Sequence, residues 1–179
     1  MVEHPIRSWM DRFSIAISRV AMFLVALIVV IMFYEVVMRY VFGSGTYWVN
    51  EMSLWTAGGV YLLAGLYVMQ QRGHIRIYIL YDMVPRSWQR VFDSISALLI
   101  VLFAAAIVWG GFNEAWAKLM RWETFGTAWD PPIPATMKPL VLLTVTLIAV
   151  QAVVNLIVDW KDEKYSHDLA EEVAEEYVD

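Results

Sequence analysis

Four long runs of apolar residues dominate the chain, and each is long enough to cross a membrane as a helix. They cover about residues 15–37, 49–69, 91–112 and 140–158. A bilayer core of about 30 Å needs about 20 helical residues at about 1.5 Å each. Lipid offers backbone groups no partner, and four segments cannot close a barrel. The pattern therefore predicts an all-α integral membrane protein with four transmembrane helices.

Two flanking segments have patterns of their own. Near the N-terminus, apolar side chains recur at helical spacing among charged ones, which predicts an amphipathic helix lying in the head-group plane before the first span. These apolar residues are Ile6, Trp9, Met10, Phe13 and Ile17. The connection from Asn113 to Pro139 contains four prolines, so its last third is predicted to be irregular.

The distribution of Lys and Arg predicts the orientation of the chain. Nine of these residues flank the spans on the side of both termini, and four lie on the other side. The side with more Lys and Arg in short loops is normally cytoplasmic. We therefore expect both termini in the cytoplasm. Residues 1–160 are expected to form a single four-helix membrane domain, followed by an acidic cytoplasmic tail over 161–179.

Composition narrows the range of functions. The chain is 60% hydrophobic and 17% charged. It is therefore more apolar and less charged than a typical soluble domain, as a membrane protein is. It has no cysteine, and His4, His74 and His167 all lie outside the apolar runs. We therefore expect no catalytic centre, metal or cofactor, and no enzyme activity. The basic excess beside the spans suits contact with membrane lipids, and nothing resembles a nucleic-acid footprint.

Three charged residues lie near the outer end of the first two spans. Glu35 and Arg39 are four apart, in the favourable order for an ion pair on one helix. Glu51 opens the next helix, where an acid complements the helix dipole. These residues are either ordinary interfacial charges or a polar clasp that fixes this hairpin or a partner protein.

The second span carries a stripe of small and aromatic residues. The stripe consists of Glu51, Trp55, Gly58, Leu62, Gly65 and Met69, at steps of three and four. Small residues on one face let another helix backbone approach closely. The stripe predicts packing either against the chain's own helices or against a larger membrane partner.

The stretch from Arg39 to Leu80 resembles the small membrane subunit of tripartite ATP-independent periplasmic (TRAP) transporters, the DctQ-like family. The matching features are Arg39-Tyr40, Trp48 with Glu51, Trp55, Gly65, Arg72 with Gly73-His74-Ile75, and the outer segment Trp129-Asp130-Pro131-Pro132 with Pro134 and Lys138. With the four-helix layout, the resemblance covers about residues 10–160. One departure is Tyr78, where many members carry an acid.

The resemblance implies an accessory role in the bacterial inner membrane. A periplasmic solute-binding protein would capture a small, anionic organic solute, and a large multi-spanning subunit would carry it with a coupling ion, typically sodium. This chain would support the large subunit and help to dock the binding protein. The residues expected at a subunit or partner interface are Glu35, Arg39, Trp48, Glu51, Trp55, Gly58, Gly65, Arg72 and His74.

Two other functions remain open at this point. The first is a haem-free membrane anchor subunit of a respiratory or redox enzyme. The second is a small transporter that works alone, although the spans lack ionisable residues near their centres. The chain does not indicate which solute would be transported.

Overall fold

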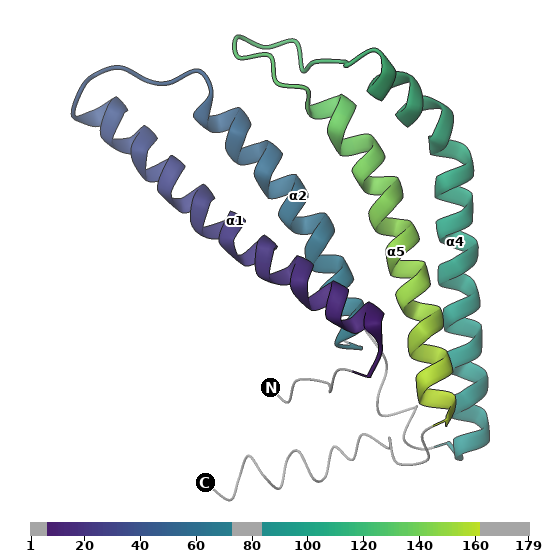
Figure 1. Cartoon of the computed structure of the whole chain (residues 1–179). Coiled ribbons are helices and arrows are strands. Elements are labelled where there is room, and N and C mark those ends of the chain that lie inside the picture. The colour runs from purple at the N-terminus through teal and green to yellow at the C-terminus, as the bar shows by residue number, and fades with distance from the viewer. Residues whose placement is uncertain (1–6, 73–83, 162–179) are drawn as a thin grey trace, which may run out of the picture.

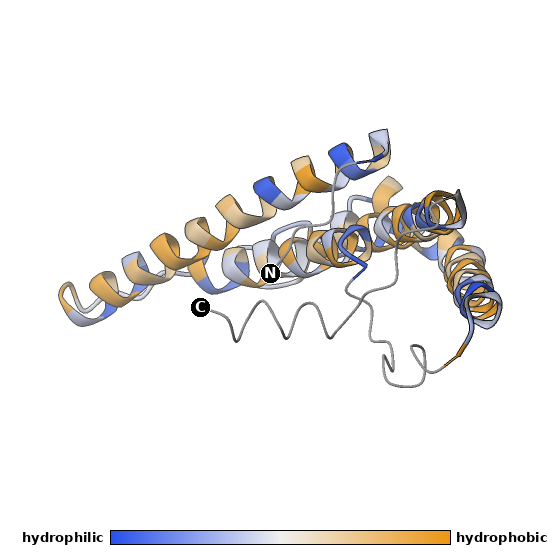
Figure 2. Ribbon diagram, turned by 90° about the horizontal axis from the view of Figure 1, so that it is seen from below, coloured by the Kyte–Doolittle hydropathy of each residue, from blue (hydrophilic) through white to orange (hydrophobic). Residues whose placement is uncertain are grey.

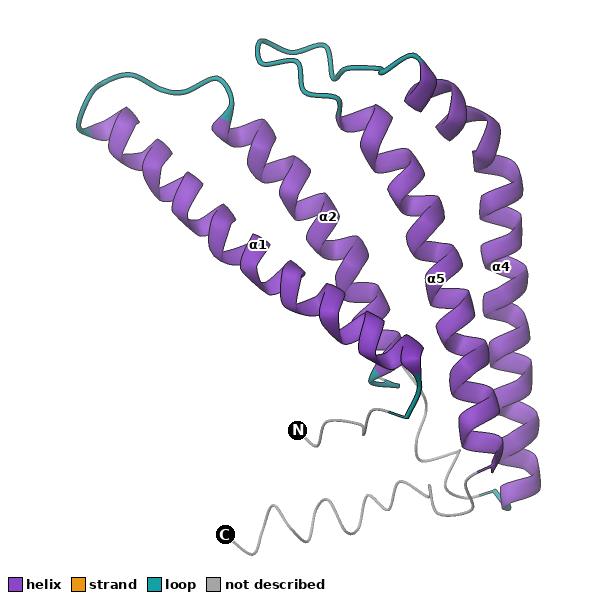
Figure 3. Ribbon diagram, in the orientation of Figure 1, coloured by secondary structure: helices purple, strands orange, loops and turns teal. Residues whose placement is uncertain are grey.

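The computed structural model describes residues 7–72 and 84–161, and these form four long helices joined by loops, with no strand among them (Figures 1 and 3). The helices are α1 (Trp9–Tyr40), α2 (Val49–Gln70), α4 (Arg86–Met120) and α5 (Ile133–Lys161). Each contains one of the four expected spans and is long and apolar enough to cross a membrane. The predicted all-α membrane fold is confirmed.

The four helices stand in a row instead of closing into a bundle. α1 packs on α2, α2 on α5, and α5 on α4, so α1 and α4 lie at the two ends of the row (Figures 1 and 2). The helices converge where α1 begins and α5 ends, and they spread apart towards the two hairpin loops (Figure 1). The α1–α2 hairpin is inclined to the α4–α5 pair. The fold is therefore one helix thick.

A single layer leaves most apolar side chains uncovered. In the most apolar stretch of each helix, between 6% and 22% of the residues are buried. Phe23 on α1 is 77% exposed and Trp109 on α4 is 89% exposed. The buried positions are mostly small, including Ala21, Ala104 and Ala152. Small residues let neighbouring helices approach closely where no water drives them together.

The N-terminal amphipathic segment forms the first turns of α1 and not a separate helix. Ser8 caps the helix by accepting a hydrogen bond from the Asp11 backbone N–H, and Asp11 accepts one from the Ser8 N–H in return. Asp11 and Ser14 are buried against α5, with 5% and 0% exposure. These polar side chains contact α5 and not the lipid head groups. The segment is therefore the beginning of the first span, in one continuous helix.

The expectation of irregular structure up to Pro139 is wrong. α5 begins at Ile133, and only residues 121–132 connect it to α4. Pro134 lies in the first helical turn, where backbone N–H groups have no intrahelical partner to lose. Pro139 lies inside the helix. Pro131 and Pro132 lie in the connecting loop. Residues 133–139 are helical although they contain two prolines, and of these Pro134 falls in the first turn, where a missing N–H costs little.

Candidate functional site

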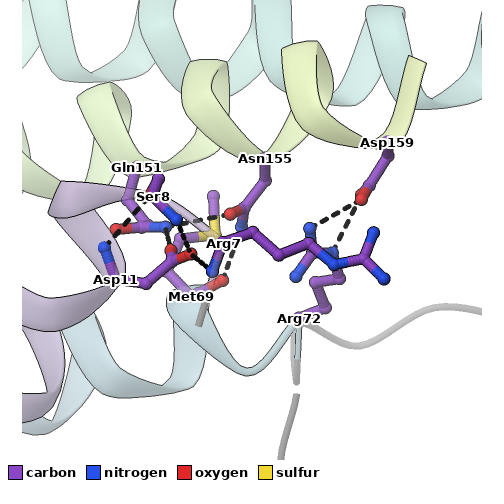
Figure 4. A network of polar contacts seen from close by, with 8 residues as sticks. All are labelled: Arg7, Ser8, Asp11, Met69, Arg72, Gln151, Asn155 and Asp159. Atoms are coloured by element: carbon purple, nitrogen blue, oxygen red, sulfur yellow. Dashed lines mark hydrogen bonds and ion pairs between the residues drawn. The ribbon is translucent and has the colours of Figure 1, made fainter. Parts of the chain in front are cut away.

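A buried polar network joins three helices at the end where α1 begins (Figure 4). At its centre lies Gln151 of α5, which is fully buried. Its Nε2 donates to Asp11 Oδ1 at 2.8 Å and to Asn155 Oδ1 at 2.9 Å. Its Oε1 accepts from the Ser14 hydroxyl at 3.0 Å. Gln151 thus uses both ends of its amide to tie α1 to α5.

Asp11 serves two structures at once. Its Oδ2 accepts from the backbone N–H groups of Arg7 at 3.0 Å and Ser8 at 2.9 Å, while its Oδ1 faces Gln151 (Figure 4). A carboxylate at the start of a helix is also favoured by the helix dipole. The same side chain therefore begins α1 and attaches it to α5.

Asn155 extends the network to the third helix. Its Nδ2 donates to the Met69 carbonyl oxygen at 2.8 Å, close to the end of α2 (Figure 4). The Met69 carbonyl, in the last turn of α2, also accepts from the Arg72 backbone N–H at 3.2 Å. Asn155 adds a second donor from α5, so the start of α1 and the end of α2 are both held by one polar face of α5.

Next to this network, Arg72 and Asp159 form an ion pair across the row (Figure 4). Arg72 Nε and one terminal nitrogen donate to the two carboxylate oxygens at 2.9 and 2.6 Å. The two side chains are 14% and 25% exposed. Arg72 also has a positive φ of 54°, a backbone conformation that residues other than glycine rarely adopt. The two-bond pair holds the chain in this turn as it leaves α2.

At the opposite end, Glu35 organises the α1–α2 loop. It pairs with Arg39 at 2.6 Å, as expected from their spacing. Its second carboxylate oxygen accepts from the backbone N–H of Thr46 at 3.0 Å and also binds the Thr46 hydroxyl. Glu35 therefore fixes the loop from inside, while the Arg39 side chain remains 62% exposed.

Glu51 does not join this pair among the described residues. Its Oε2 is buried and has no hydrogen-bond partner there. The expected three-residue network is therefore a Glu35–Arg39–Thr46 network. A buried carboxylate oxygen without a donor is costly, so this position calls for a further partner.

Aromatic residues connect the two hairpins at the same end. Trp129, in the loop between α4 and α5, lies 6.4 Å from both Trp48 and Trp55, measured between ring centroids. Trp55 Nε1 also donates to the Thr136 hydroxyl of α5 at 2.9 Å. The family-like tryptophans of the sequence therefore form one cluster that bridges α2 and α5.

Ion pairs also stabilise α4 and α5 at the end where their connecting loop lies. Lys118 binds Glu123, and Lys138 binds Glu114. The hydrogen bond from Lys118 holds the pKa of the Glu123 carboxyl below its usual range. In the connecting loop, Asp130 accepts from the Gly126 backbone N–H at 2.7 Å. These contacts give the loop a defined shape from its own residues.

The small residues of α2 face α5 of the same chain. A Cβ added at Gly58 would lie 3.2 Å from Met137 Sδ, and one at Gly65 would lie 3.4 Å from Ile148 Cδ1. Both glycines therefore serve the α2–α5 contact within the chain. Of the other expected interface residues, His74 lies outside the described residues.

The polar and aromatic side chains described above make contacts between helices. Within residues 7–72 and 84–161 no three His, Asp or Glu side chains gather in a way that could hold a metal ion. The polar groups at both ends are hydrogen-bonded across helices, which suits a structural role. Sequence analysis missed the Gln151 network, although Gln151 and Asn155 stand four apart in a span without charges.

Comparison with protein families identifies the chain. Residues 28–162 match the family model described as tripartite ATP-independent periplasmic transporters, DctQ component. The chain belongs to this family. The DctQ component is the small membrane component of a TRAP transporter, as the resemblance implied. A search of curated proteins and a search of solved structures find no match.

The match divides the polar network. Gln151, Asn155 and Met69 lie within the residues matched to the DctQ model, whereas Asp11 and Ser14 precede them. The features at the hairpin-loop end, from Glu35 to the tryptophan cluster, are all included. The match begins within α1, which is one continuous helix from Trp9 to Tyr40.

Proposed function

We propose that this chain is the accessory membrane subunit of a TRAP-type secondary transporter in a bacterial inner membrane. It supports a large, multi-spanning transport subunit and helps to dock a periplasmic solute-binding protein. Both termini lie in the cytoplasm, in accord with the nine Lys and Arg residues on their side. The subunit itself takes no catalytic step.

The observation that carries this proposal is the single row of helices. In the described part of the chain, one layer of four helices does not surround a passage for a solute (Figure 2). Both broad faces are apolar, and few residues of each span are covered within the chain. A wall of this kind is suited to supporting a second membrane protein laterally.

Support for docking comes from the outer end of the row. Tyr40, Phe42 and Tyr47 surround the α1–α2 loop and are 80%, 67% and 79% exposed. The Arg39 guanidinium lies beside them. Exposed aromatic residues with an arginine are typical of protein interfaces. Because Glu35 holds the loop from inside, this surface is presented in a fixed shape.

We propose that an ion gradient drives uptake. The description of the family as ATP-independent supports this, because it excludes ATP hydrolysis as the energy source. We propose sodium as the coupling ion and a small, anionic organic compound as the solute. The determinants of both would lie in the large subunit and the binding protein.

The first experiment is affinity purification of this chain from its native membrane in mild detergent, with mass spectrometry of the co-purified proteins. We expect a large polytopic transporter subunit in near-equal amount. An unrelated tagged four-helix membrane protein serves as the control. Recovery of a redox enzyme, or of this chain alone, would contradict the proposal.

A second experiment tests the outer end. Glu51→Gln removes the charge of the carboxylate whose buried oxygen lacks a donor in the described structure, and we expect impaired uptake at an unchanged amount of membrane-inserted chain. Glu114→Gln is the matched control, because Glu114 already has Lys138 as its partner. Unaltered uptake with Glu51→Gln would assign Glu51 to ordinary interfacial charge.

A further inference from the structure

A groove runs between α2 and α4 over the surface of α5, and its lining changes from polar to apolar along its length. The polar end is a cavity of about 240 Å³ near the Arg72–Asp159 pair. The apolar part is a cavity of about 500 Å³. Leu99 and Ile100 of α4 line both, so the two cavities lie next to each other along α4.

The polar end contains one arginine with a nitrogen that has no acceptor. Two arginines and two aspartates line it, namely Arg72, Arg90, Asp93 and Asp159. Arg72 is bound at both carboxylate oxygens of Asp159. Arg90, in contrast, has a buried Nε without a hydrogen-bond partner among the described residues. Its guanidinium lies 5.6 Å from the centroid of the Trp160 ring. Because Arg90 lines this cavity and Arg72 is already paired with Asp159, the Arg90 guanidinium is the group at this end that can take an anionic oxygen.

The two parts of the groove together have the length of a lipid chain. The apolar part is lined by Gly65, Val68, Phe103, Ala104, Val145 and Ile148, besides the two shared residues. From Arg90 to Ala104 the helix rises about 21 Å, at about 1.5 Å per residue. One leaflet's hydrocarbon is about 15 Å thick, half of the bilayer core. A chain that begins at Arg90 can thus stay in the groove through a whole leaflet.

We propose that this groove binds one membrane phospholipid, with its phosphate on Arg90 and one acyl chain along α2, α4 and α5. A guanidinium recognises phosphate oxygens by charge-assisted hydrogen bonds, and an arginine beside a tryptophan is typical of the head-group level. A free anion would leave the apolar part unfilled. An apolar helix of a partner would leave the Arg90 guanidinium at the polar end without an anionic partner. The lipid closes the seam between α2 and α4, which have no extensive contact of their own.

The test uses the full chain, purified with whatever remains bound to it and placed in nanodiscs of phosphatidylethanolamine and phosphatidylglycerol. A small fraction of the lipid carries a photoreactive diazirine in its acyl chain. Mass spectrometry then compares labelling of Phe103, in the groove, with labelling of Phe23, which is 77% exposed on α1. We expect Phe103 to be labelled in preference to Phe23.

Two variants and one control decide the outcome. Arg90→Ala should lower the Phe103-to-Phe23 labelling ratio about tenfold, the effect of one charge-assisted hydrogen bond, and Arg90→Lys should retain part of it. Arg121→Ala, which removes a 70% exposed arginine at the other end of α4, should leave the ratio unchanged. Val68→Trp, at a half-exposed residue of the groove, should lower the ratio without touching the polar end.

Circular dichroism and size-exclusion chromatography establish that each variant is folded, and Val68→Trp decides the matter if Arg90→Ala is not. A ratio that neither Arg90→Ala nor Val68→Trp changes would overturn the proposal. So would cross-links from the groove to another protein in place of lipid. The proposal does not depend on the accessory role, because it concerns a surface of this chain alone.

Discussion

At the scale of single residues, Gln151 is the side chain of α5 that is hydrogen-bonded to α1. Its amide makes one hydrogen bond through oxygen and two through nitrogen, to partners on α1 and on its own helix. In an apolar surrounding, each of these partners would be left without water if Gln151 were lost. This uncharged side chain therefore contributes to the attachment of α1 to α5.

We predict that Gln151→Ala lowers the free energy of unfolding by about 1–3 kcal/mol, because it leaves buried polar partners unsatisfied. Thermal unfolding in a mild detergent measures the effect as a lower midpoint temperature. Thr146→Ala on the same helix is the control, since the Thr146 hydroxyl is exposed and bonds only to the Leu142 carbonyl of its own helix. Equal midpoints for the two variants would contradict the prediction.

The Arg72–Asp159 pair can be tested separately. Arg72→Ala and Asp159→Ala should each destabilise the chain, since each leaves a partly buried charge without its partner. The double variant should lose less than the sum of the two, with a coupling energy of about 0.5–3 kcal/mol. Unfolding midpoints of all four proteins give this coupling. Strict additivity would mean that the pair contributes nothing.

At the scale of elements, close packing between helices depends on glycine at particular faces. On α4, a Cβ added at Gly111 would lie 3.1 Å from Leu142 Cδ2 of α5, whereas one added at the adjacent Gly110 meets nothing within 4 Å. Gly110 and Gly111 are both helical, but only Gly111 faces α5. They provide a matched test of how tightly α4 must approach α5.

We predict that Gly111→Leu destabilises the chain by about 1–3 kcal/mol, because its side chain forces α4 away from α5. Gly110→Leu should have little effect, since its side chain points outward. The amount of folded monomer after mild heating, measured by size-exclusion chromatography, separates the two. If both variants behave alike, helix propensity and not packing governs this region.

The membrane and the spacing within one helix could be used to predict structure from the sequence, whereas contacts between helices could not. The spans followed from apolar runs, since the bilayer fixes their length and forces them to be helical. The Glu35–Arg39 pair followed from spacing within one helix. The contacts of Gln151, Arg72 and Trp55 join residues more than 80 positions apart, and periodicity along one helix carries no information about its partner.

At the scale of the whole molecule, the order α1–α2–α5–α4 is the main feature that the apolar pattern did not predict. Four apolar helices could equally have closed into a bundle, in which α1 touches α4. The tryptophan cluster at the hairpin loops and the polar network at the opposite end both act between α5 and the first hairpin. They hold the row at its two ends, which leaves the broad faces free for lipid and partners.

Paired cysteines test this order cleanly, because the chain has no cysteine of its own. With a short thiol-reactive cross-linker, Gly58→Cys with Met137→Cys should link α2 to α5, since a Cβ at position 58 would lie 3.2 Å from Met137 Sδ. Phe23→Cys with Leu102→Cys, on the helices at opposite ends of the row, should not link. Mobility on denaturing gels after proteolysis of the connecting loops gives the readout. A link between Phe23 and Leu102 would indicate a closed bundle.

The helices in this row differ greatly in length. α2 has 22 residues, whereas α4 has 35, which correspond to about 33 Å and about 52 Å. The hydrocarbon core of about 30 Å matches α2 almost without tilt, while α4 must extend into the head groups or lean. α2 is thus the element most sensitive to hydrophobic mismatch, and it lies between α1 and α5. A bilayer of longer acyl chains would be too thick for α2 before it was too thick for the other helices. Because α2 packs on both α1 and α5, a change in membrane thickness would act on the whole row through α2.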